Sequence, residues 1–220
     1  MFSARRVFPC LIAVAVAAFP LAALGQEQSP NQRLLAAGRA GDAAGVTHAL
    51  AQGATPDARN RIGETVLLIA LKNNRPELAR QMIAAGTDVN LAAANGVTPL
   101  MAAAHGGYTE IVRSLLAKGA EVRAVDRLQK NAMTYAAGQG QTDIVVLLLN
   151  AGVDPNAIYA HELTALMWAA GYGRSETVKA LLAAGARSDF RDDRGKTALD
   201  IAREGNFTDT AKLLQSAARS

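Results

Sequence analysis

Apolar and polar positions follow a helical period over short stretches of this 220-residue chain. In the stretch 109–119, Ile111, Val112, Leu115 and Leu116 stand at positions i, i+1, i+4 and i+5, which places them on one face of an α-helix. The alanine-rich stretch 99–105 precedes it and is also apolar. The pattern predicts two short helices in succession, each with one face that must be covered.

Residues at the ends of these stretches predict where each helix begins and ends. Thr98 is a preferred N-cap, and Pro99 suits the first helical position because its missing N–H costs nothing there. Thr109 is predicted to cap the second helix, with an acid behind it in the first turn, and Gly119 to end that helix in a left-handed conformation. Three residues hold the place of Thr109 elsewhere in the chain: Thr142, Ser175 and Thr208.

The same order of residues returns every 33 positions. Three tracks keep this interval: Thr65, Thr98, Asn131, Thr164 and Thr197; Gly53, Gly86, Gly119, Gly152 and Gly185; and Ala37, Ala70, Ala103, Ala136, Ala169 and Ala202. Self-similarity at this period is typical of solenoids. Helices shorter than about 12–15 residues are marginal in water, so we expect each unit to be stabilised by its neighbours. The small alanines are expected to let adjacent inner helices approach closely.

The stretch 96–122, GVTPLMAAAHGGYTEIVRSLLAKGAEV, resembles the ankyrin repeat, and small exported bacterial members of that family in particular. Its TPLM at Thr98 is similar to the family signature, with looser copies TVLL, TALM and TALD at Thr65, Thr164 and Thr197, and no copy keeps the signature histidine. The resemblance covers residues 31–220. It implies an all-α repeat: an ankyrin solenoid of about six 33-residue helix-turn-helix units joined by β-hairpin-like loops.

The resemblance and the repeat together divide the chain into units. The expected units are 31–58 (N-terminal cap), 59–91, 92–124, 125–157, 158–190 and 191–220 (C-terminal cap). The unit 125–157 lacks the tip glycine and has Asn131 in place of threonine. Asparagine is as good an N-cap as threonine, so a normal helix after a less regular hairpin is expected there.

The first 25 residues have the plan of a secretory signal peptide. Arg5 and Arg6 precede an apolar run to Leu24, and small residues end the run before Gln26. We therefore expect cleavage after Gly25, a short tether at residues 26–30, and a mature protein that is periplasmic or secreted. The alternative is that the apolar run stays as a membrane anchor, and only then would a membrane be a partner.

The composition expected after removal of the signal peptide reduces the number of possible classes of function. The single cysteine, Cys10, leaves with it, so no disulfide, cysteine metal site or thiol chemistry is expected. Loss of Arg5 and Arg6 leaves 21 Lys and Arg against 19 Asp and Glu, without a basic cluster that would indicate nucleic acid. The dominance of small apolar residues over aromatic ones suits closely packed helices.

The sequence offers little support for catalysis. His48, His105 and His161 stand at different positions of their repeats, so no metal site is expected, and no nucleophile elbow or His-Glu-x-x-His motif occurs. The GQG and GYG motifs at Gly138 and Gly171 coincide with inter-helix turns, so no cofactor or small-molecule substrate is expected. Tyr135 and Trp168 share a position with isoleucines and are interpreted as core residues.

The resemblance implies that a partner protein binds the hairpin tips and the exposed ends of the inner helices, which form the concave surface of a solenoid. The tips carry Arg61, Ile62, Glu64, Asn95, Val97, Arg127, Leu128, Lys130, His161, Leu163, Asp193, Arg194 and Lys196. The helix ends carry Lys72, Asn73, His105, Gln139 and Tyr172. The cations Arg127, Lys130, Arg194 and Lys196 make the tips mildly basic around an apolar centre at Leu128, Leu163 and Tyr172, which favours an acidic or mixed protein surface as partner.

The leading interpretation is therefore a non-catalytic, monomeric, exported protein-interaction module with no cofactor. The family resemblance suggests two settings, protection of an enzyme under oxidative stress or neutralisation of a toxin. A membrane-tethered scaffold and a hydrolase with an unrecognised site are the alternatives from other classes.

Overall fold

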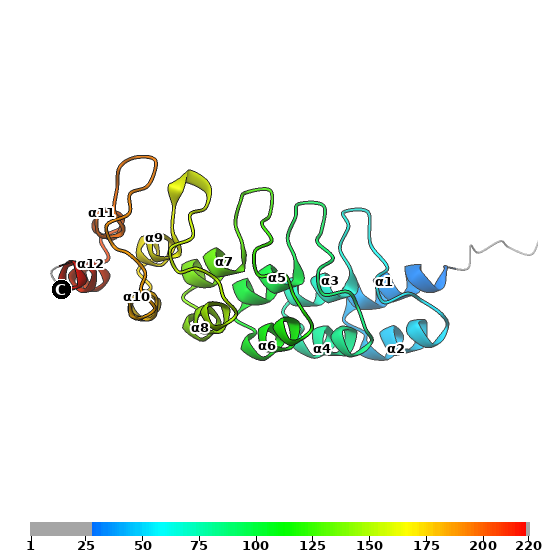
Figure 1. The fold of residues 1–220 in the computed structure, drawn as a ribbon. Coiled ribbons are helices and arrows are strands. Elements are labelled where there is room, and N and C mark those ends of the chain that lie inside the picture. Colours follow the sequence, from blue (N-terminus) through cyan, green and yellow to red (C-terminus); the bar gives the residue numbers. More distant parts are fainter. Residues whose placement is uncertain (1–27, 219–220) are drawn as a thin grey trace, which may run out of the picture.

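The chain folds into a row of helix pairs, which Figure 1 shows side by side along one axis. The computed structural model describes residues 28–218, and these form twelve α-helices, one 3-10 turn (Ala160–Glu162) and no strand. The helices are α1 (Pro30–Ala40), α2 (Ala43–Ala51), α3 (Val66–Lys72), α4 (Pro76–Ala84), α5 (Pro99–Gly106), α6 (Thr109–Ala117), α7 (Ala132–Gln139), α8 (Thr142–Asn150), α9 (Ala165–Gly171), α10 (Ser175–Ala183), α11 (Ala198–Glu204) and α12 (Thr208–Ala217). The expected all-α solenoid is confirmed.

The predicted signal peptide and the first residues of the predicted tether lie outside the described residues. The end of that tether belongs to the first helix instead. Ser29 is the N-cap of α1, and its side chain and that of Gln32 form a reciprocal capping box. The helix begins at Pro30, where proline is favoured.

The inner helices α3, α5, α7, α9 and α11 begin where the sequence predicts. In each of them the residue of the threonine track is the N-cap, and its side chain accepts a hydrogen bond from a backbone N–H in the first turn. Asn131 forms a full capping box with Thr134, so the expectation of a normal helix in that unit is confirmed. A cap of this kind contributes about 1 kcal/mol, which defines the start of each inner helix.

The predicted caps of the outer helices are wrong by one residue. Helices α6, α8, α10 and α12 already include Thr109, Thr142, Ser175 and Thr208, and the residues before them make no side-chain cap. Each preceding residue is the centre of a tight turn, with φ near that of Tyr108 (−83°) and ψ near 71°. This turn places the hydroxyl residue inside the helix. Two of the hydroxyls instead link successive units, since Thr142 bonds to Thr177 and Ser175 to Thr210.

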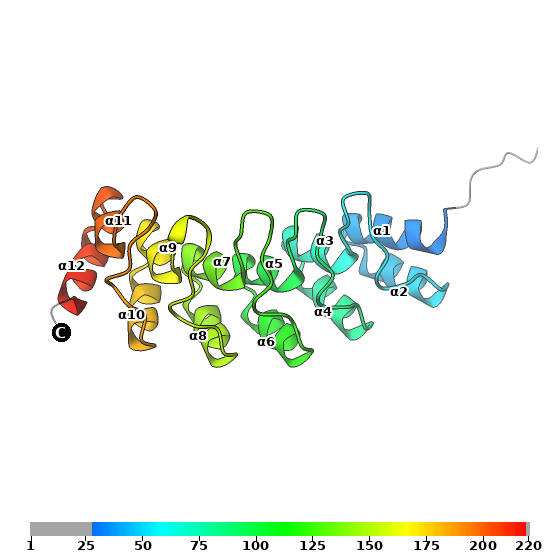
Figure 2. The ribbon, with the colours of Figure 1, turned by 45° about the horizontal axis from the view of Figure 1, so that its top comes forward.

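The helices form two layers. Each odd-numbered helix packs on the next odd-numbered one, and from α4 onward each even-numbered helix packs on the next even-numbered one. Figure 2 shows the two rows with the hairpins above the odd-numbered, inner row. Ala103, Ala136 and Ala169 have no exposed surface, as expected for small residues between closely packed inner helices. The largest buried side chains, such as Leu100, Leu115, Met133 and Leu148, contribute to one continuous core.

The third hairpin, residues 126–130, forms the same turn as the fifth, so the expectation of a less regular hairpin there is wrong. The Asp126 N–H donates to the Lys130 carbonyl (2.8 Å) and the Gln129 N–H to the Asp126 carbonyl (2.9 Å), as their counterparts do in residues 192–196. Gln129 adopts the left-handed conformation (φ 56°) that Gly195 adopts there (φ 77°). The irregular hairpin is 159–163, where His161 and Glu162 both have positive φ.

We expect Gln129→Gly to raise the free energy of unfolding by about 0.5–1 kcal/mol, because glycine removes the left-handed strain that glutamine bears there. Urea unfolding measures the change. Gly195→Ala is the matched control: nothing lies within 4 Å of its added Cβ, so it introduces backbone strain alone and should lower stability. A Gln129→Gly protein less stable than the parent would contradict the interpretation that the left-handed conformation strains Gln129.

A candidate protein-binding surface on the hairpins and inner helices

Five hairpins lie beside the exposed ends of the inner helices and make one continuous surface, called here the concave surface. The hairpins span residues 60–64, 93–97, 126–130, 159–163 and 192–196. Backbone bonds join three of the four neighbouring pairs of hairpins: Ala94 N–H donates to the Ile62 carbonyl, Arg127 to Asn95, and Asp193 to His161. Figure 1 shows the hairpins projecting in parallel from the inner layer. The predicted contact residues are therefore held in a fixed order along the stack.

Most of the predicted contact residues reach solvent. Ile62, Leu128 and Tyr172 are large apolar side chains with 57%, 65% and 52% of their surface exposed. The other exposed members are Arg61, Asn95, Arg127, His105, Gln139, His161, Asp193 and Arg194, and the half-buried ones are Val97, Lys130, Leu163 and Lys196. Scattered apolar exposure is ordinary, but exposed aromatic and large aliphatic groups on one face are typical of binding surfaces.

Glu64 differs from the rest of the predicted contact set because it is buried. Its carboxylate accepts hydrogen bonds from Asn60 and Lys72, and only 10% of its side chain is exposed. Burial disfavours its charged form, but these two bonds outweigh that effect and hold the pKa of Glu64 below its usual value. Its observed role is to connect the first hairpin with the end of α3.

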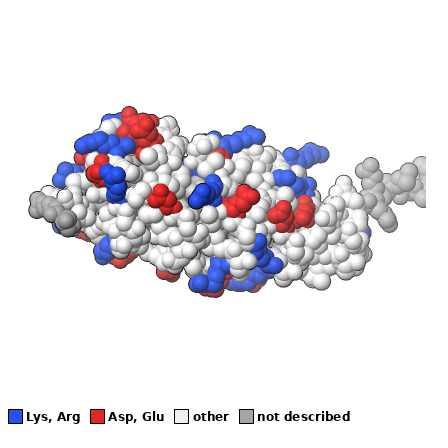
Figure 3. All heavy atoms as spheres, viewed as in Figure 1, with Lys and Arg blue, Asp and Glu red and all other residues white. Residues whose placement is uncertain are grey.

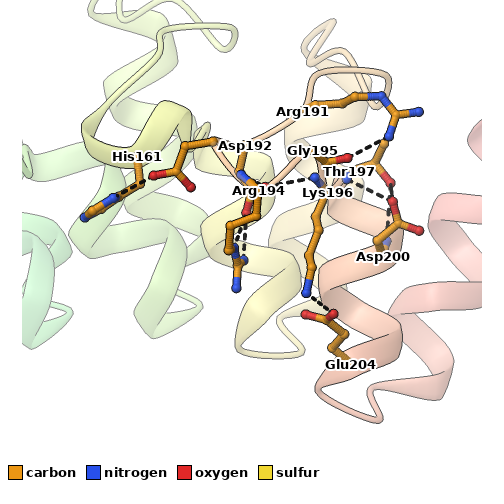
Figure 4. Close-up of polar contacts among 10 residues, drawn as sticks. His161, Arg191, Asp192, Arg194, Gly195, Lys196, Thr197, Asp200 and Glu204 are labelled. Atoms are coloured by element: carbon orange, nitrogen blue, oxygen red, sulfur yellow. Dashed lines mark hydrogen bonds and ion pairs between the residues drawn. The ribbon is translucent and has the colours of Figure 1, made fainter.

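The charged side chains of the last hairpin form ion pairs and hydrogen bonds within the chain. Figure 4 shows Arg194 pairing with Asp192, Lys196 with Glu204, and the Arg191 guanidinium donating to the Gly195 carbonyl. On the preceding hairpin, His161 Nδ1 lies 2.9 Å from a carboxylate oxygen of Asp193. Two of the four tip cations that the sequence analysis considered available are therefore neutralised within the chain.

One cation at the centre of the surface, Lys130, stands at a position where the first and last hairpins form an ion pair. Glu64 on the first hairpin forms an ion pair with Lys72 at the end of α3, and both positions recur every 33 residues. On the last hairpin the same two positions hold Lys196 and Glu204, which form an ion pair with the signs exchanged. Of the three units between them, two hold Val97 with His105 and Leu163 with Gly171, and only the middle one has a lysine at the hairpin position, Lys130, with Gly138 at the helix position. No carboxylate within residues 28–218 lies within 4.0 Å of the Lys130 ammonium, so this lysine is without an ion pair there.

Lys130 instead lies against aromatic rings. Its Nζ is 4.4 Å from the centroid of the Trp168 ring and 5.9 Å from that of Tyr135. Trp168 stacks on Tyr172 at 6.2 Å, and Tyr135 meets His105 edge to face at 5.6 Å. A cation over such rings gains about 0.5–2 kcal/mol depending on its solvation. The four rings and the ammonium form the central cluster of the concave surface.

The interpretation of Tyr135 and Trp168 as core residues is only partly right. Both are half-buried, and both contribute to the central cluster. Gly138 lies directly beside the cluster: a Cβ built there would be in van der Waals contact with the rings of Tyr172 at 3.5 Å and Trp168 at 3.7 Å. The Trp168 indole N–H is buried and has no hydrogen-bond partner among residues 28–218. Packing and the neighbouring cation hold this ring in place.

A cavity of about 510 Å³ adjoins the cluster. Val97, Met101 and Tyr135 line it with apolar surface, and Lys72 and His105 contribute the polar groups. Its volume is within the range of ligand sites. Tyr135 lines the cavity and its ring centroid lies 5.9 Å from the Lys130 ammonium, so the cavity and the cation share this ring.

Sequence analysis missed the residues that hold the hairpins in shape. Asn60, Asp126 and Asp192 occupy one position of the repeat, and each accepts hydrogen bonds from the backbone amides two and four residues ahead. All of these bonds are 2.8–3.0 Å long. Asparagine and aspartate favour such turns. The recurrence of Asn or Asp at this position in three of five units was the available signal.

Hydrogen bonding couples the third hairpin to its helix. The Tyr135 hydroxyl donates to Asp126 Oδ2 at 2.6 Å. Burial of the phenol, together with the hydrogen bond to this carboxylate and its negative charge, raises the pKa of Tyr135 well above its usual value. Tyr135 is therefore protonated at neutral pH and remains a donor to Asp126.

The three histidines lie apart, with separate partners: His48 bonds to Gln52, His105 contacts Tyr135 and His161 contacts Asp193. Within residues 28–218 no group of three His, Cys, Asp or Glu side chains could hold a metal ion. None of the helices described in this range is long and apolar enough to cross a membrane.

The family model for ankyrin repeats (3 copies) matches residues 34–126, 67–159 and 133–219. These matches together span almost all of the described helices. The chain belongs to the ankyrin repeat family. A comparison with curated proteins finds no significant match.

The ankyrin repeats of this chain replace the signature histidine with two kinds of residue. Leu68, Met101 and Met167 fill the position with buried apolar side chains. Thr134 and Asp200 fill it with polar groups that complete capping boxes with Asn131 and Thr197. The inner helices of this ankyrin array thus keep a defined start without the histidine.

Ankyrin repeats are protein–protein interaction modules, and the charge distribution fits such a role. Figure 3 shows Lys and Arg interspersed with Asp and Glu over the face in view, with neither sign forming one continuous area. Mixed charge of this kind is typical of surfaces that bind proteins, whereas a nucleic-acid site needs a basic stripe.

Proposed function

We propose that this ankyrin array is a non-catalytic, exported module that binds one partner protein through its concave surface. The observation that carries the proposal is the central cluster, in which Tyr172 and the adjacent tip residue Leu128 are largely exposed around an unpaired lysine. Tyrosine and tryptophan are enriched among the few residues that dominate the energetics of protein interfaces.

Binding rather than turnover fits the chemistry of the surface. A reaction centre requires a nucleophile, acid or base held near a second polar group. The carboxylates of Glu64, Asp126 and Asp192 are instead occupied by backbone and side-chain hydrogen bonds that shape the hairpins. The partner could be an enzyme that the module protects or a toxin that it neutralises.

We expect the exported protein to begin at Gln26. The basic start, apolar run and small residues before this position are the features that signal peptidases recognise. N-terminal sequencing of the protein recovered from the cell envelope or medium measures this. A chain that retains residues 1–25 in the membrane fraction would favour the tethered scaffold.

We expect Leu128→Ser combined with Tyr172→Ser to reduce capture of the native partner at least tenfold, because two central apolar contacts contribute more than about 1.4 kcal/mol. Affinity purification from the native cell envelope, followed by quantitative mass spectrometry, measures the loss. The side chains are exposed, so thermal unfolding should change little.

The matched control for this pair is Val146→Ser. Val146 is a 41% exposed apolar residue of α8, in the outer layer away from the hairpins. Capture should survive this change. Equal loss from the inner and outer substitutions would reject the concave surface as the binding site.

A further inference from the structure

We propose that the central cluster is an anchor site for an Asp or Glu side chain of the partner protein that has an apolar side chain next to it. The inference rests on the proposed function and specifies the chemistry of the same surface. It follows from three features: a lysine whose ion-pair partner position holds glycine, rings that fix the lysine, and a neighbouring cavity.

The missing ion pair defines the charge that the partner must supply. Lys72 and Lys196 each contact a carboxylate of the same unit. Lys130 stands at the hairpin position of Lys196, but Gly138 replaces the residue that would neutralise it. Asp126 does not neutralise it either, because its two oxygens are bound by the amides of Leu128 and Lys130 and by the Tyr135 hydroxyl. The charge left without a counter-ion at this position is therefore the positive charge of Lys130.

The surroundings make Lys130 a better anchor than a freely moving surface lysine. Contact with Trp168 and Tyr135 restricts the side chain and removes part of its hydration. A hydrogen bond between charged groups in such a place contributes more than one in bulk water, since less entropy and hydration are lost on binding. The backbone beneath is fixed, as the Lys130 N–H donates to Asp126 at 2.9 Å.

The neighbouring cavity defines the second feature of the partner. An apolar side chain inserted between Val97, Met101 and Tyr135 would contact the ring whose centroid lies 5.9 Å from the Lys130 ammonium. An acidic residue close to it in sequence could then reach the lysine. A buried apolar anchor beside a charge contact is the arrangement found at interface hot spots.

A polyanion such as a nucleic acid fits this site poorly. The next hairpin presents the exposed Glu162, the last hairpin presents the exposed Asp193, and Lys72 is already neutralised by Glu64. A single carboxylate can meet Lys130 and avoid these acids, whereas a run of phosphates would be repelled by them. The favoured occupant is therefore one acidic residue in an otherwise apolar segment.

The experiment selects short random peptides on phage against the purified mature protein and measures the selected synthetic peptides by fluorescence of Trp168, the only tryptophan in the chain. We expect the peptides to share an Asp or Glu beside an aromatic or aliphatic residue and to change the Trp168 emission. Lys130→Met keeps the apolar stem against the rings and should weaken binding about tenfold or more. Lys196→Met, the ion-paired control, should change affinity less than about twofold.

A double-mutant cycle separates charge recognition from loss of folding. Replacing the peptide Glu by Gln should weaken binding to the parent protein about as much as Lys130→Met does, and should have little further effect on that variant. Peptides that change Trp168 emission without needing an acid, or that bind Lys130→Met unchanged, would overturn the inference and leave the proposed function intact. A library without binders would overturn it as well. Failure of the proposed function itself would be seen separately, as partner capture that survives Leu128→Ser with Tyr172→Ser.

Discussion

We expect Asp126→Ala to lower the free energy of unfolding by about 3 kcal/mol, since the substitution removes one buried acceptor from three donors. The side chain is almost fully buried, and alanine offers no replacement for its oxygens. The amides of Leu128 and Lys130 and the Tyr135 hydroxyl would lose their partner together. Urea unfolding followed by circular dichroism measures the loss.

The repeat itself supplies the control for this prediction. Asn60 makes the same two backbone bonds in the first hairpin, so Asp126→Asn should retain them and cost about 1 kcal/mol or less. Tyr135→Phe, which removes only the hydroxyl, should also have a small effect. If Asp126→Asn is as destabilising as Asp126→Ala, the negative charge rather than the turn geometry is what the hairpin needs.

Ala136→Leu is expected to cost about 3 kcal/mol, because overpacking of a closed contact forces both backbones apart. Ala136 has no exposed surface, and its helix α7 packs between α5 and α9. The extra carbon atoms of the leucine side chain have no space between α7 and its two neighbouring helices. Since solenoid stability depends on the interfaces between neighbours, we also expect one cooperative unfolding transition to become broader or to split in two.

Circular dichroism and Trp168 emission, recorded on the same urea titration, test this prediction. The two signals should coincide in the parent protein and separate in Ala136→Leu if the stack is divided at α7. The control is Ala183→Leu near the end of α10, where the residue is exposed and the effect should stay within about 0.5 kcal/mol. A parent-like transition in Ala136→Leu would show that the inner helices can separate without loss of coupling.

The sequence predicted the repeat and the inner helices well because these depend on local preferences. Threonine or asparagine caps, a small residue between helices and a glycine after each outer helix are each required by one local geometry, and each recurs every 33 residues. The outer-helix caps were misplaced by one residue. Threonine is acceptable both as the N-cap and in the first turn of a helix, and the tight turn at Tyr108 places Thr109 in the first turn.

Two features of the binding surface were predicted wrongly, one because of bonds within a hairpin and one because of contacts between units. Gln129 adopts a left-handed conformation because Asp126 fixes the turn around it, so the missing glycine was misleading. Tyr135 shares its repeat position with buried Ile69, yet it is only half-buried and meets His105 of the preceding unit edge to face. Position in the repeat predicts the direction of a side chain, whereas its exposure depends on the next unit.

The packing of each helix row in simple succession has an evolutionary consequence. Duplication or loss of one whole unit, such as residues 92–124, would leave the remaining hairpins in the same register along the stack. An insertion of a different length would put the Asn or Asp of one turn out of step with the next. Descendants of this gene can therefore gain or lose recognition sites in complete modules, and exchange the specificity of one hairpin while the rest of the array is inherited unchanged.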